Sequence, residues 1–402
     1  MLFKKFVILG GGPSGLSIAR TLLDHGEDSF VVLEKESEPG GLCRSLDVDG
    51  APIDSGGGHI LDVKHTEVTQ MLFRFLPREE WRLFKRISRI RLCGIEIDYP
   101  LEAHLWQLPL LEQVEFLESI ARAGCVAGTP MPDSFSDWII WKLGERIASQ
   151  YMLPYNRKLW SCDLDELGVY WLEKLPNVSF RDTLTGCISK EFHGTIPAHG
   201  EFLYPARYGY GEVWRRMGQS LGDKLLLDTP VTSIDWERRT VNNNYQAGII
   251  ISTIPWPVWL TIAEMPERIA DKIRRLRHVS IDVDYVPESP GTEAHWVYEP
   301  DESLAYHRIL CRQNFSGGTG YWTETNSTRA VETKGWRYRN DYAYPVNTIQ
   351  KPTIMKELLR WCQDNGIKGA GRWGRWEHLN SDVAVLEGIM MARNMIHCGC
   401  GI

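Results

Sequence analysis

The sequence lacks a long hydrophobic run. Its longest apolar stretch without a charged residue, residues 247–263, contains Pro255 and Pro257. A membrane-spanning helix needs roughly 20 apolar residues and is disrupted by proline, so this stretch predicts a buried strand followed by a loop. The apolar run near the N-terminus stops at Gly10, which is too early for a secretory signal. We therefore expect no membrane span.

The spacing of cysteines that would indicate a metal or redox site is also missing. The chain has nine cysteines at scattered positions, and its one close pair is Cys398 and Cys400. Zinc sites and redox motifs need clustered ligands, such as two cysteines separated by two residues. The sequence thus predicts no metal site, and it predicts reduced thiols in a cytoplasmic protein.

A long basic block is absent as well. The formal net charge is -7, and the most basic segment, residues 84–91, is short. A nucleic-acid-binding protein needs a basic face, so this class of function is excluded. Any anionic ligand must be bound by a few local cations.

Aromatic residues, by contrast, are abundant. The 402 residues include 16 tryptophans and 15 tyrosines. They serve either as additional core mass or as the walls of a pocket that stacks a planar ligand. The chain is longer than a single domain of ~100–200 residues, so we expect more than one lobe.

The N-terminal segment has the pattern of a dinucleotide-binding fold. An apolar strand at residues 6–9 precedes a glycine-rich turn at 10–15, a helix at 16–23 and a second strand at 30–33 that ends in Glu34. A strand, a glycine turn, a helix, a strand and an acid within about thirty residues are typical of this fold.

The three glycines of the turn have different functions. Gly10 permits the tight turn, Gly12 lets the backbone approach a pyrophosphate, and Gly15 lets the helix pack closely against the strand. The N-terminus of the helix offers free N–H groups to the phosphates, and Glu34 accepts hydrogen bonds from a ribose.

The next segments resemble the second glycine motif of the flavin amine oxidase superfamily, at residues 38–45 and 54–59. This resemblance implies FAD rather than NAD, with Arg44 near the pyrophosphate and His59 near the flavin ring. It also implies that residues 228–234 form a strand near the adenine and that residues 371–374 and 381–383 close the FAD site. The predicted cofactor-binding residues are Gly10, Gly12, Pro13, Ser14, Gly15, Glu34, Lys35, Gly41, Leu42, Arg44, Gly57, Gly58, His59, Val231, Gly371, Arg372, Asp382 and Val383.

Most of the chain resembles the UDP-galactopyranose mutase family. Each matching segment is modest alone, but their order is shared over about 370 residues. The segments are residues 99–101, 135–138, 155–160, 171–176, 202–207, 209–214, 308–316, 344–346, 371–374 and 381–383.

This resemblance implies a flavin-dependent nucleotide-sugar mutase. Such an enzyme interconverts pyranose and furanose forms of a nucleotide-diphosphate sugar, with reduced FAD as the nucleophile. It suits polysaccharide biosynthesis, NAD(P)H is a candidate external reductant, and a homo-oligomer is compatible with it. The implied catalytic residues are His59, Arg308 and Lys174, and the implied substrate-binding residues are Tyr155, Trp160, Tyr204, Asn314 and Tyr344.

Each of these residues has a structural alternative. Arg308 is either a diphosphate ligand or part of an internal salt bridge, and Tyr204 and Tyr344 are either hydrogen-bond donors or core residues. Tyr155 and Trp160 are either stacking residues or packing residues of a helical lobe.

The chain also departs from the family pattern. Lys174 stands where the bacterial pattern has arginine, and lysine cannot bind a phosphate with a two-pronged fork. Glu102 and Ala103 replace two amides, and residues 317–340 are either a mobile lid or an insertion. An FAD-dependent oxidoreductase of the amine oxidase or protoporphyrinogen oxidase type therefore remains an alternative, as does a flavoprotein without catalysis.

The predicted fold class is α/β. A Rossmann-like FAD-binding domain is expected to combine with a mixed-sheet substrate domain and a small inserted helical domain. The predicted boundaries place residues 1–98, 226–265 and 351–402 in the FAD-binding domain, 99–178 in the helical domain, 179–225 in a mixed-sheet and linker region, and 266–350 in the mixed-sheet domain.

Overall fold

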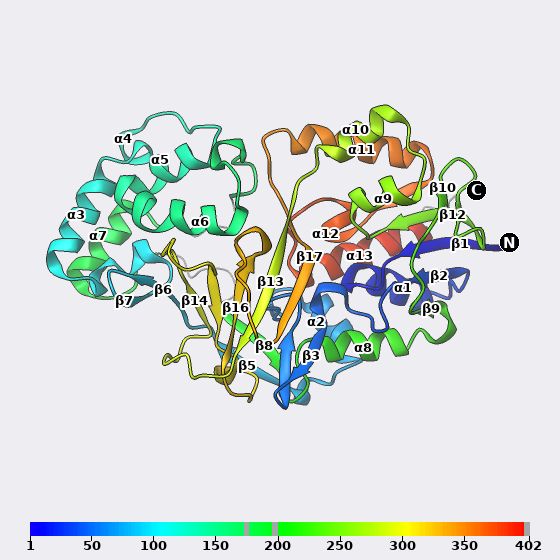
Figure 1. Cartoon of the computed structure of the whole chain (residues 1–402), viewed down its shortest axis with the longest axis horizontal. Helices are drawn as coiled ribbons and strands as arrows, with labels where there is room; N and C mark the ends of the chain where they lie inside the picture. Colours follow the sequence, from blue (N-terminus) through cyan, green and yellow to red (C-terminus); the bar gives the residue numbers. More distant parts are fainter. Residues whose placement is uncertain (173–176, 195–199, 398–402) are drawn as a thin grey trace.

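A computed structural model describes residues 1–172, 177–194 and 200–397. Its first sheet is Rossmann-like, and the long strand β1 (Leu2–Leu9) lies at its centre (Figure 1). β1 pairs in parallel with β2 (Phe30–Leu33) on one side and with β12 (Tyr245–Ser252) on the other. The remaining strands are β9 (Leu225–Leu226) beside β2, β18 (Ile367–Gly369) beside β12, and the antiparallel edge of β10 (Ile234–Asp235) and β11 (Thr240–Val241).

Helices cover both faces of this sheet because alternate residues of β1 point to opposite sides. Ile8 packs in the core that includes α1 (Pro13–Asp24) and α13 (Ser381–His397). Val7 and Leu9 pack in a second core that is formed with the helices of the other face. Those helices are α9 (Trp256–Ile262), α10 (Glu267–Arg274) and α11 (Lys351–Asp364).

The predicted strands and helix at the N-terminus are confirmed, and two other predictions are wrong. A helix, α9, follows the strand instead of a loop: Pro255 is its N-cap residue and Pro257 lies in its first turn, where a proline leaves no helix hydrogen bond unmade. Residues 229–233, expected in a strand, have no sheet partner, and β10 begins only at Ile234.

The second sheet is mixed, and its strands come from segments that the predicted boundaries assigned to different domains. Its order is β17 (Arg337–Pro345), β13 (His278–Val286), β16 (Tyr321–Asn326), β15 (Arg308–Leu310), β14 (Trp296–Tyr298), β6 (Ser88–Leu92) and β7 (Ile95–Asp98). The hairpin of β6 and β7 therefore belongs to the second sheet, although residues up to 98 were predicted to belong to the FAD-binding domain. Residues 317–340 are not one lid, because they supply β16 and the start of β17.

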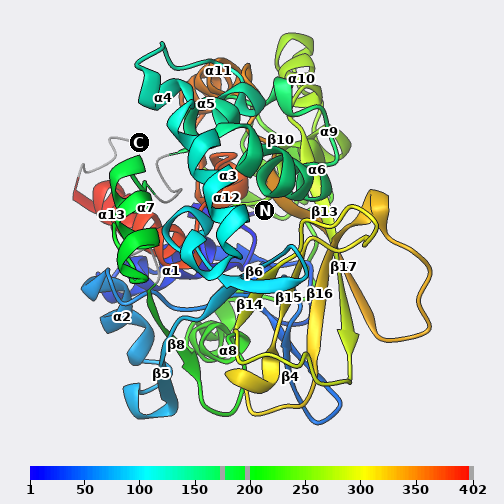
Figure 2. The same ribbon diagram turned by 90° about the vertical axis from the view of Figure 1, so that its left-hand side faces the viewer.

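The helical lobe lies beyond the β6–β7 end of this sheet (Figures 1 and 2). It comprises α3 (Leu110–Ala121), α4 (Gly124–Ala127), α5 (Phe135–Ile147), a π-helix at residues 148–152, α6 (Leu153–Trp160) and α7 (Phe180–Ser189). Gly144 has φ 79° and interrupts α5 where it crosses α3, and a Cβ there would be only 2.6 Å from the carbonyl oxygen of Ser119. Because α7 packs on α3, the lobe extends past the predicted end at residue 178.

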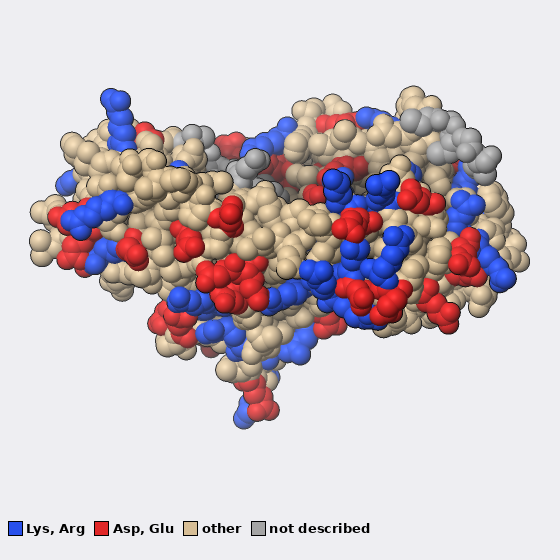
Figure 3. Space-filling view, turned by 90° about the horizontal axis from the view of Figure 1, so that it is seen from above, with Lys and Arg blue, Asp and Glu red and all other residues tan. Residues whose placement is uncertain are grey.

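Smaller elements connect the lobes. They are the hairpin of β3 (Ser45–Val48) and β4 (Ala51–Asp54), α2 (Thr66–Phe73), the antiparallel pair β5 (Trp81–Lys85) and β8 (Glu201–Pro205), α8 (Gly211–Gln219) against α1, and α12 (Gly371–Gly374). Within the described ranges, none of the helices has the length and apolar character needed to cross a membrane. Basic and acidic side chains are interspersed on the face in Figure 3, without a large basic area.

Candidate functional site

A cavity of about 410 Å³ lies where β1, β2 and β12 end and where β17 of the second sheet comes close. Cavities at the carboxyl ends of parallel strands are the usual ligand sites of such folds. Twelve of the predicted cofactor-binding residues line it: Gly10, Gly12, Pro13, Ser14, Glu34, Lys35, Gly41, Leu42, Arg44, His59, Val231 and Arg372.

In the glycine turn before α1, two glycines are required by the fold itself and a third leaves space for a ligand. Gly10 has φ +102°, and a Cβ on Gly15 would overlap the carbonyl oxygen of Gly10, so the fold itself needs both glycines. A Cβ on Gly12 would meet no atom nearer than the Cα of Gly41, at 3.8 Å. Gly12 therefore borders open space at the start of α1, where no side chain caps the helix N-terminus. This arrangement suits an anionic group.

Glu34, at the end of β2, is buried and bound by backbone amides. Its two oxygens accept hydrogen bonds from the amides of Gly11, at 2.6 Å, and Glu36, at 3.0 Å. Lone pairs remain on both oxygens, so the carboxylate can also accept a hydroxyl of a ligand in the cavity.

Arg44 is bound on three sides. Its guanidinium donates to the carbonyl oxygen of Gly41 at 3.1 Å, to the carboxylate of Glu36 at 3.0 Å and to the hydroxyl of Tyr338 at 2.8 Å. Glu36 thus balances the charge of Arg44, which the sequence placed next to a pyrophosphate.

Arg372 differs from Arg44 because no carboxylate balances it. Its guanidinium donates to the carbonyl oxygens of Ala343 (2.9 Å) and Leu379 (2.7 Å), and no ion pair joins it to any acidic residue in the described part of the chain. Burial lowers its pKa from the ordinary arginine value. A half-buried cation that lines a cavity and has no carboxylate partner among the described residues fits an anionic ligand.

His59 is half-buried at the cavity wall and is neutral. Its Nδ1 lies 2.9 Å from the carbonyl oxygen of Gly57, and its ring stacks on that of Tyr210 with 6.4 Å between centroids. Burial, together with the positive charges of Arg372 and Arg308, lowers its pKa to about 3. The imidazole therefore offers hydrogen bonds without a charge.

Arg308, Glu324 and Tyr344 come together from three strands of the second sheet. Arg308 pairs with the buried carboxylate of Glu324, and its Nη2 lies 3.5 Å from the hydroxyl of Tyr344. Burial opposes the charge on Arg308, but Glu324 and the neighbouring tyrosine hydroxyls together raise the arginine pKa above its ordinary value. The ring of Tyr344 also lies below Arg372, with 5.3 Å from its centroid to the guanidinium carbon.

An aromatic cluster joins this group to the helical lobe. Tyr155 of α6 meets the ring of Tyr298 edge-on at 5.5 Å and that of His307 at 5.8 Å, and Tyr99 lies 5.3 Å from Tyr298. Burial raises the pKa of Tyr155 well above its ordinary value, so its hydroxyl stays protonated. Glu102 is buried as well, and its burial raises the pKa of its carboxyl, which weakens any repulsion of an anion.

Three predicted substrate residues have their polar groups occupied elsewhere. The Trp160 indole donates to Asn156 at 3.1 Å within α6, and the Tyr204 hydroxyl donates to Asp54 at 3.1 Å in the core. The Asn314 amide donates to the carbonyl oxygens of residues 292 and 294 and so braces a loop. These contacts agree with the structural alternative for Trp160 and Tyr204, and the role of all three residues in substrate binding stays a prediction. Lys174 lies outside the described residues.

Six predicted cofactor residues are not part of the cavity lining, for reasons of packing. Gly15 and Gly371 face the protein, since a Cβ on Gly371 would overlap the Ser14 hydroxyl. Asp382 is buried with one oxygen 3.7 Å from Nε2 of His65. The remaining three are Gly57, Gly58 and Val383.

The sequence missed Glu324. It lies opposite Arg308 in the register of β15 and β16, within the segment that was expected to be a lid or an insertion. The sequence feature that could have indicated Glu324 is a single acid within the strand-like residues 321–326. Its pairing with Arg308 depends on the register of two strands, which the sequence does not show. Tyr338, Asn340 and Tyr342 of β17, which line the cavity, were missed for the same reason.

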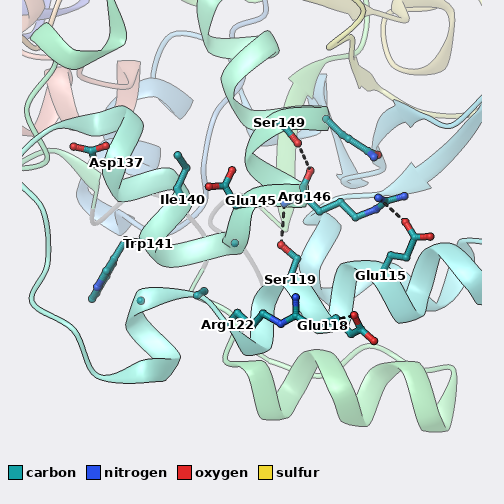
Figure 4. Close-up of a pocket in the computed structure, with 14 residues that line it drawn as sticks. Glu115, Glu118, Ser119, Arg122, Asp137, Ile140, Trp141, Glu145, Arg146 and Ser149 are labelled. Carbon is teal, nitrogen blue, oxygen red and sulfur yellow. Dashed lines mark hydrogen bonds and ion pairs between the residues drawn. The ribbon is translucent and has the colours of Figure 1, made fainter.

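A second hollow of about 680 Å³ lies on the helical lobe between α3, α4 and α5 (Figure 4). Its polar side chains are mostly paired with one another, as Arg146 is with Glu115 and Arg122 with Glu118. None of the predicted site residues lines it. Within the described ranges, no group of His, Cys, Asp and Glu side chains is arranged to hold a metal ion.

Comparisons with known proteins agree with this architecture. Residues 8–75 match the model of the NAD(P)-binding Rossmann-like domain. A crystal structure of reduced UDP-galactopyranose mutase superposes with a TM-score of 0.88 at 22% identity, over 99% of this chain and 95% of that chain. A putative protoporphyrinogen oxidase from Exiguobacterium gives 0.71 at 16% identity, over 98% of both chains. A fatty acid isomerase from P. acnes gives 0.67 at 15% identity, over 97% of this chain and 98% of the other.

One curated relative is close in sequence. An uncharacterized protein of Methanothermococcus thermolithotrophicus is 41% identical over 99 residues, which are 23% of this chain and 95% of that protein. The chain therefore belongs to the family of this protein, and it has the fold of UDP-galactopyranose mutase.

Proposed function

We propose that the protein is a flavin-dependent mutase that interconverts the pyranose and furanose forms of a nucleotide-diphosphate sugar. The observation that carries the proposal is an excess of positive charge on two half-buried arginines. Arg372 and Arg308 both contact Tyr344, and Glu324 is their one carboxylate partner among the described residues. An anionic ligand would balance this charge through charge-assisted hydrogen bonds.

The residues around the cavity fit FAD. The open side of Gly12 and the uncapped N-terminus of α1 would hold the pyrophosphate, and Glu34 would accept a ribose hydroxyl. The positive charge of Arg372, which no carboxylate of the described residues balances, would pair with the anionic cofactor. The resemblance of the glycine segments to the flavin amine oxidase superfamily supports the same cofactor.

Bound in its reduced form, FAD would supply a nucleophilic nitrogen for the anomeric carbon of the sugar. The protein residues bind and orient the substrate. Arg308 binds the diphosphate and stabilises the charge that develops on it when the glycosidic bond breaks, while Tyr344 donates a hydrogen bond from its hydroxyl. His59, kept neutral, faces the cavity without repelling a cation.

The substrate class follows from the fold and from the aromatic cluster. The similarity to UDP-galactopyranose mutase favours a nucleotide sugar, and Tyr155 is available for its base or sugar ring. Such an activity suits polysaccharide biosynthesis in the cytoplasm with an external reductant such as NAD(P)H. Consistent with a reducing compartment, all seven cysteines in the described ranges are free thiols.

The test is a turnover assay with FAD-loaded protein reduced by dithionite. UDP-, dTDP- and GDP-sugars are incubated separately, and the ring form of each product is identified by NMR. We expect turnover with one nucleotide class, and only after reduction. Equal turnover by the oxidised protein would refute the proposal.

The second candidate is an FAD-dependent oxidoreductase, which the similarity to the putative protoporphyrinogen oxidase favours. It requires a substrate that reduces the flavin and yields hydrogen peroxide on reoxidation. Flavin bleaching by an amine or a ring compound, with peroxide formed in equal amount, would establish this candidate instead.

A further inference from the structure

Glu324 is a buried acid whose two oxygens serve two different parts of the site. It lies on β16 and is fully shielded from solvent. Its Oε1 accepts a hydrogen bond from the backbone amide of Gly58 at 3.0 Å, and its Oε2 pairs with the guanidinium of Arg308. Burying a charged carboxylate is costly unless it is paired in this way.

The charged partner of Glu324 is Arg308. His307 is also near, with its Nε2 3.8 Å from Oε2, but burial and the neighbouring arginine lower the histidine pKa well below its ordinary value. His307 is therefore neutral. Arg308 is the remaining charged partner of Glu324 in the described part of the chain.

The turn that Glu324 contacts is held tightly against the second sheet. Gly57 has φ +93°, and a Cβ on it would lie 2.8 Å from Oε1 of Glu324. A Cβ on Gly58 would overlap the side chain of Leu310 on β15. His59, the next residue, lines the cavity. The position of this cavity wall thus depends on β15 and β16.

We infer that Glu324 is a positioning residue that fixes Arg308 relative to the Gly57–Gly58–His59 turn. Arg308 binds the substrate anion and the turn borders the cofactor cavity. The carboxylate of Glu324 therefore fixes the position of the substrate site relative to the cofactor site. The identity of the two ligands rests on the proposed function. The contacts of Glu324 do not depend on it.

Two substitutions separate the two contacts. Glu324→Gln keeps a carbonyl oxygen that accepts the Gly58 amide but has no charge to hold Arg308. Glu324→Ala removes both contacts. Asp284→Asn is the matched control, because Asp284 pairs with Arg337 across β13 and β17 of the same sheet, outside the turn.

The contact with the turn is tested by hydrogen–deuterium exchange of the peptide that contains Gly58, with no ligand added. We expect exchange at least fivefold faster in Glu324→Ala, and within about twofold of wild type in Glu324→Gln and Asp284→Asn. Equal exchange in all four proteins, or equal acceleration in the Gln and Ala variants, would overturn this half of the inference. This measurement holds whether or not the proposed function is correct.

The contact with Arg308 is tested on FAD-loaded protein with UDP as the probe. Because Glu324 competes with an anion for Arg308, the Glu324→Gln variant should bind UDP at least as tightly as wild type, while kcat falls at least tenfold. In protein that already carries Arg308→Ala, adding Glu324→Gln should cause no further loss of UDP affinity or of kcat. Weaker UDP binding, unchanged kcat or additive losses would overturn this half. Wild-type protein that binds no UDP would refute the proposed function instead, and the exchange measurement would still decide the role of Glu324 at the turn.

Discussion

The guanidinium of Arg372 lies over the ring of Tyr344, with 5.3 Å between its central carbon and the ring centroid. The hydroxyl of the same tyrosine lies 3.5 Å from Arg308. Tyr344 therefore stands between one arginine that lines the cavity and one that belongs to the second sheet. Its ring attracts the guanidinium of Arg372, because an aromatic face attracts a cation. Each arginine can then be tested separately.

Replacing Arg308 with alanine should abolish nucleotide binding and leave FAD in place. We expect the affinity for UDP to fall by at least about 100-fold, since two charged hydrogen bonds of ~1.5–3 kcal/mol each are lost. The free energy of unfolding should also fall by about 3–5 kcal/mol, because the buried Glu324 loses its partner. Calorimetry with UDP and denaturant unfolding measure the two effects.

Arg308→Lys is the control for this prediction. It keeps the charge near Glu324 but loses the planar fork, so we expect most of the stability to return and little of the UDP affinity. Unchanged UDP affinity in Arg308→Ala would remove this residue from the substrate site.

Gly12 and Gly15 of the turn should respond differently to substitution. Gly12→Val should fold normally, because the protein leaves space there, but it should purify without the yellow colour of FAD. Gly15→Ala should lower the melting temperature, since its Cβ overlaps the Gly10 carbonyl oxygen. Flavin absorbance and thermal unfolding distinguish the two defects. A yellow Gly12→Val protein would contradict the assignment of this cavity to FAD.

Local patterns predicted the first part of the fold well. The strand at 30–33 and the glycine turn depend on neighbours within a few residues, so their sequence carries the information. Gly10, Gly12 and Glu34, which line the cavity, were found in the same way, whereas Arg44 and His59 were found through the resemblance of the second glycine motif. Arg372 was found through the family resemblance, and its lack of a carboxylate partner became visible only in three dimensions.

The rest depends on contacts between distant segments. Tyr204 was predicted to bind substrate, but the core places Asp54 within reach of its hydroxyl, 150 residues away in the chain. Glu324 was missed because only the register of β15 and β16 sets it opposite Arg308. A one-residue slip in that register would point the acid to the other face of the sheet.

Removing the charge of Arg372 should make His59 easier to protonate. Burial lowers the pKa of His59 to about 3, and the charge of Arg372 is the next cause. In Arg372→Gln the histidine pKa should rise toward, but not reach, its ordinary value of 6.5, because burial remains. NMR titration of the His59 ring measures it, and an unchanged pKa would show that the two groups do not interact.

Asp54 should make the stability of the protein depend on pH. The side chain is fully buried, and although Oδ1 accepts hydrogen bonds from Ser45 (2.6 Å) and Tyr204 (3.1 Å), Oδ2 has no partner. Burial raises the pKa of this carboxyl from 3.8 to about 7. Between these two values the folded protein keeps a proton that the unfolded chain releases.

The free energy of unfolding should therefore lose a contribution from Asp54 as the pH rises from about 4 to about 7, and lose no more above that range. Asp54→Asn cannot release this proton. Subtracting its pH profile from that of wild type, measured by urea unfolding, removes the effects of other groups such as His59, whose lowered pKa acts in the opposite direction. The difference should slope downward with pH, and parallel profiles would show that Asp54 is ionised in the folded protein throughout this range.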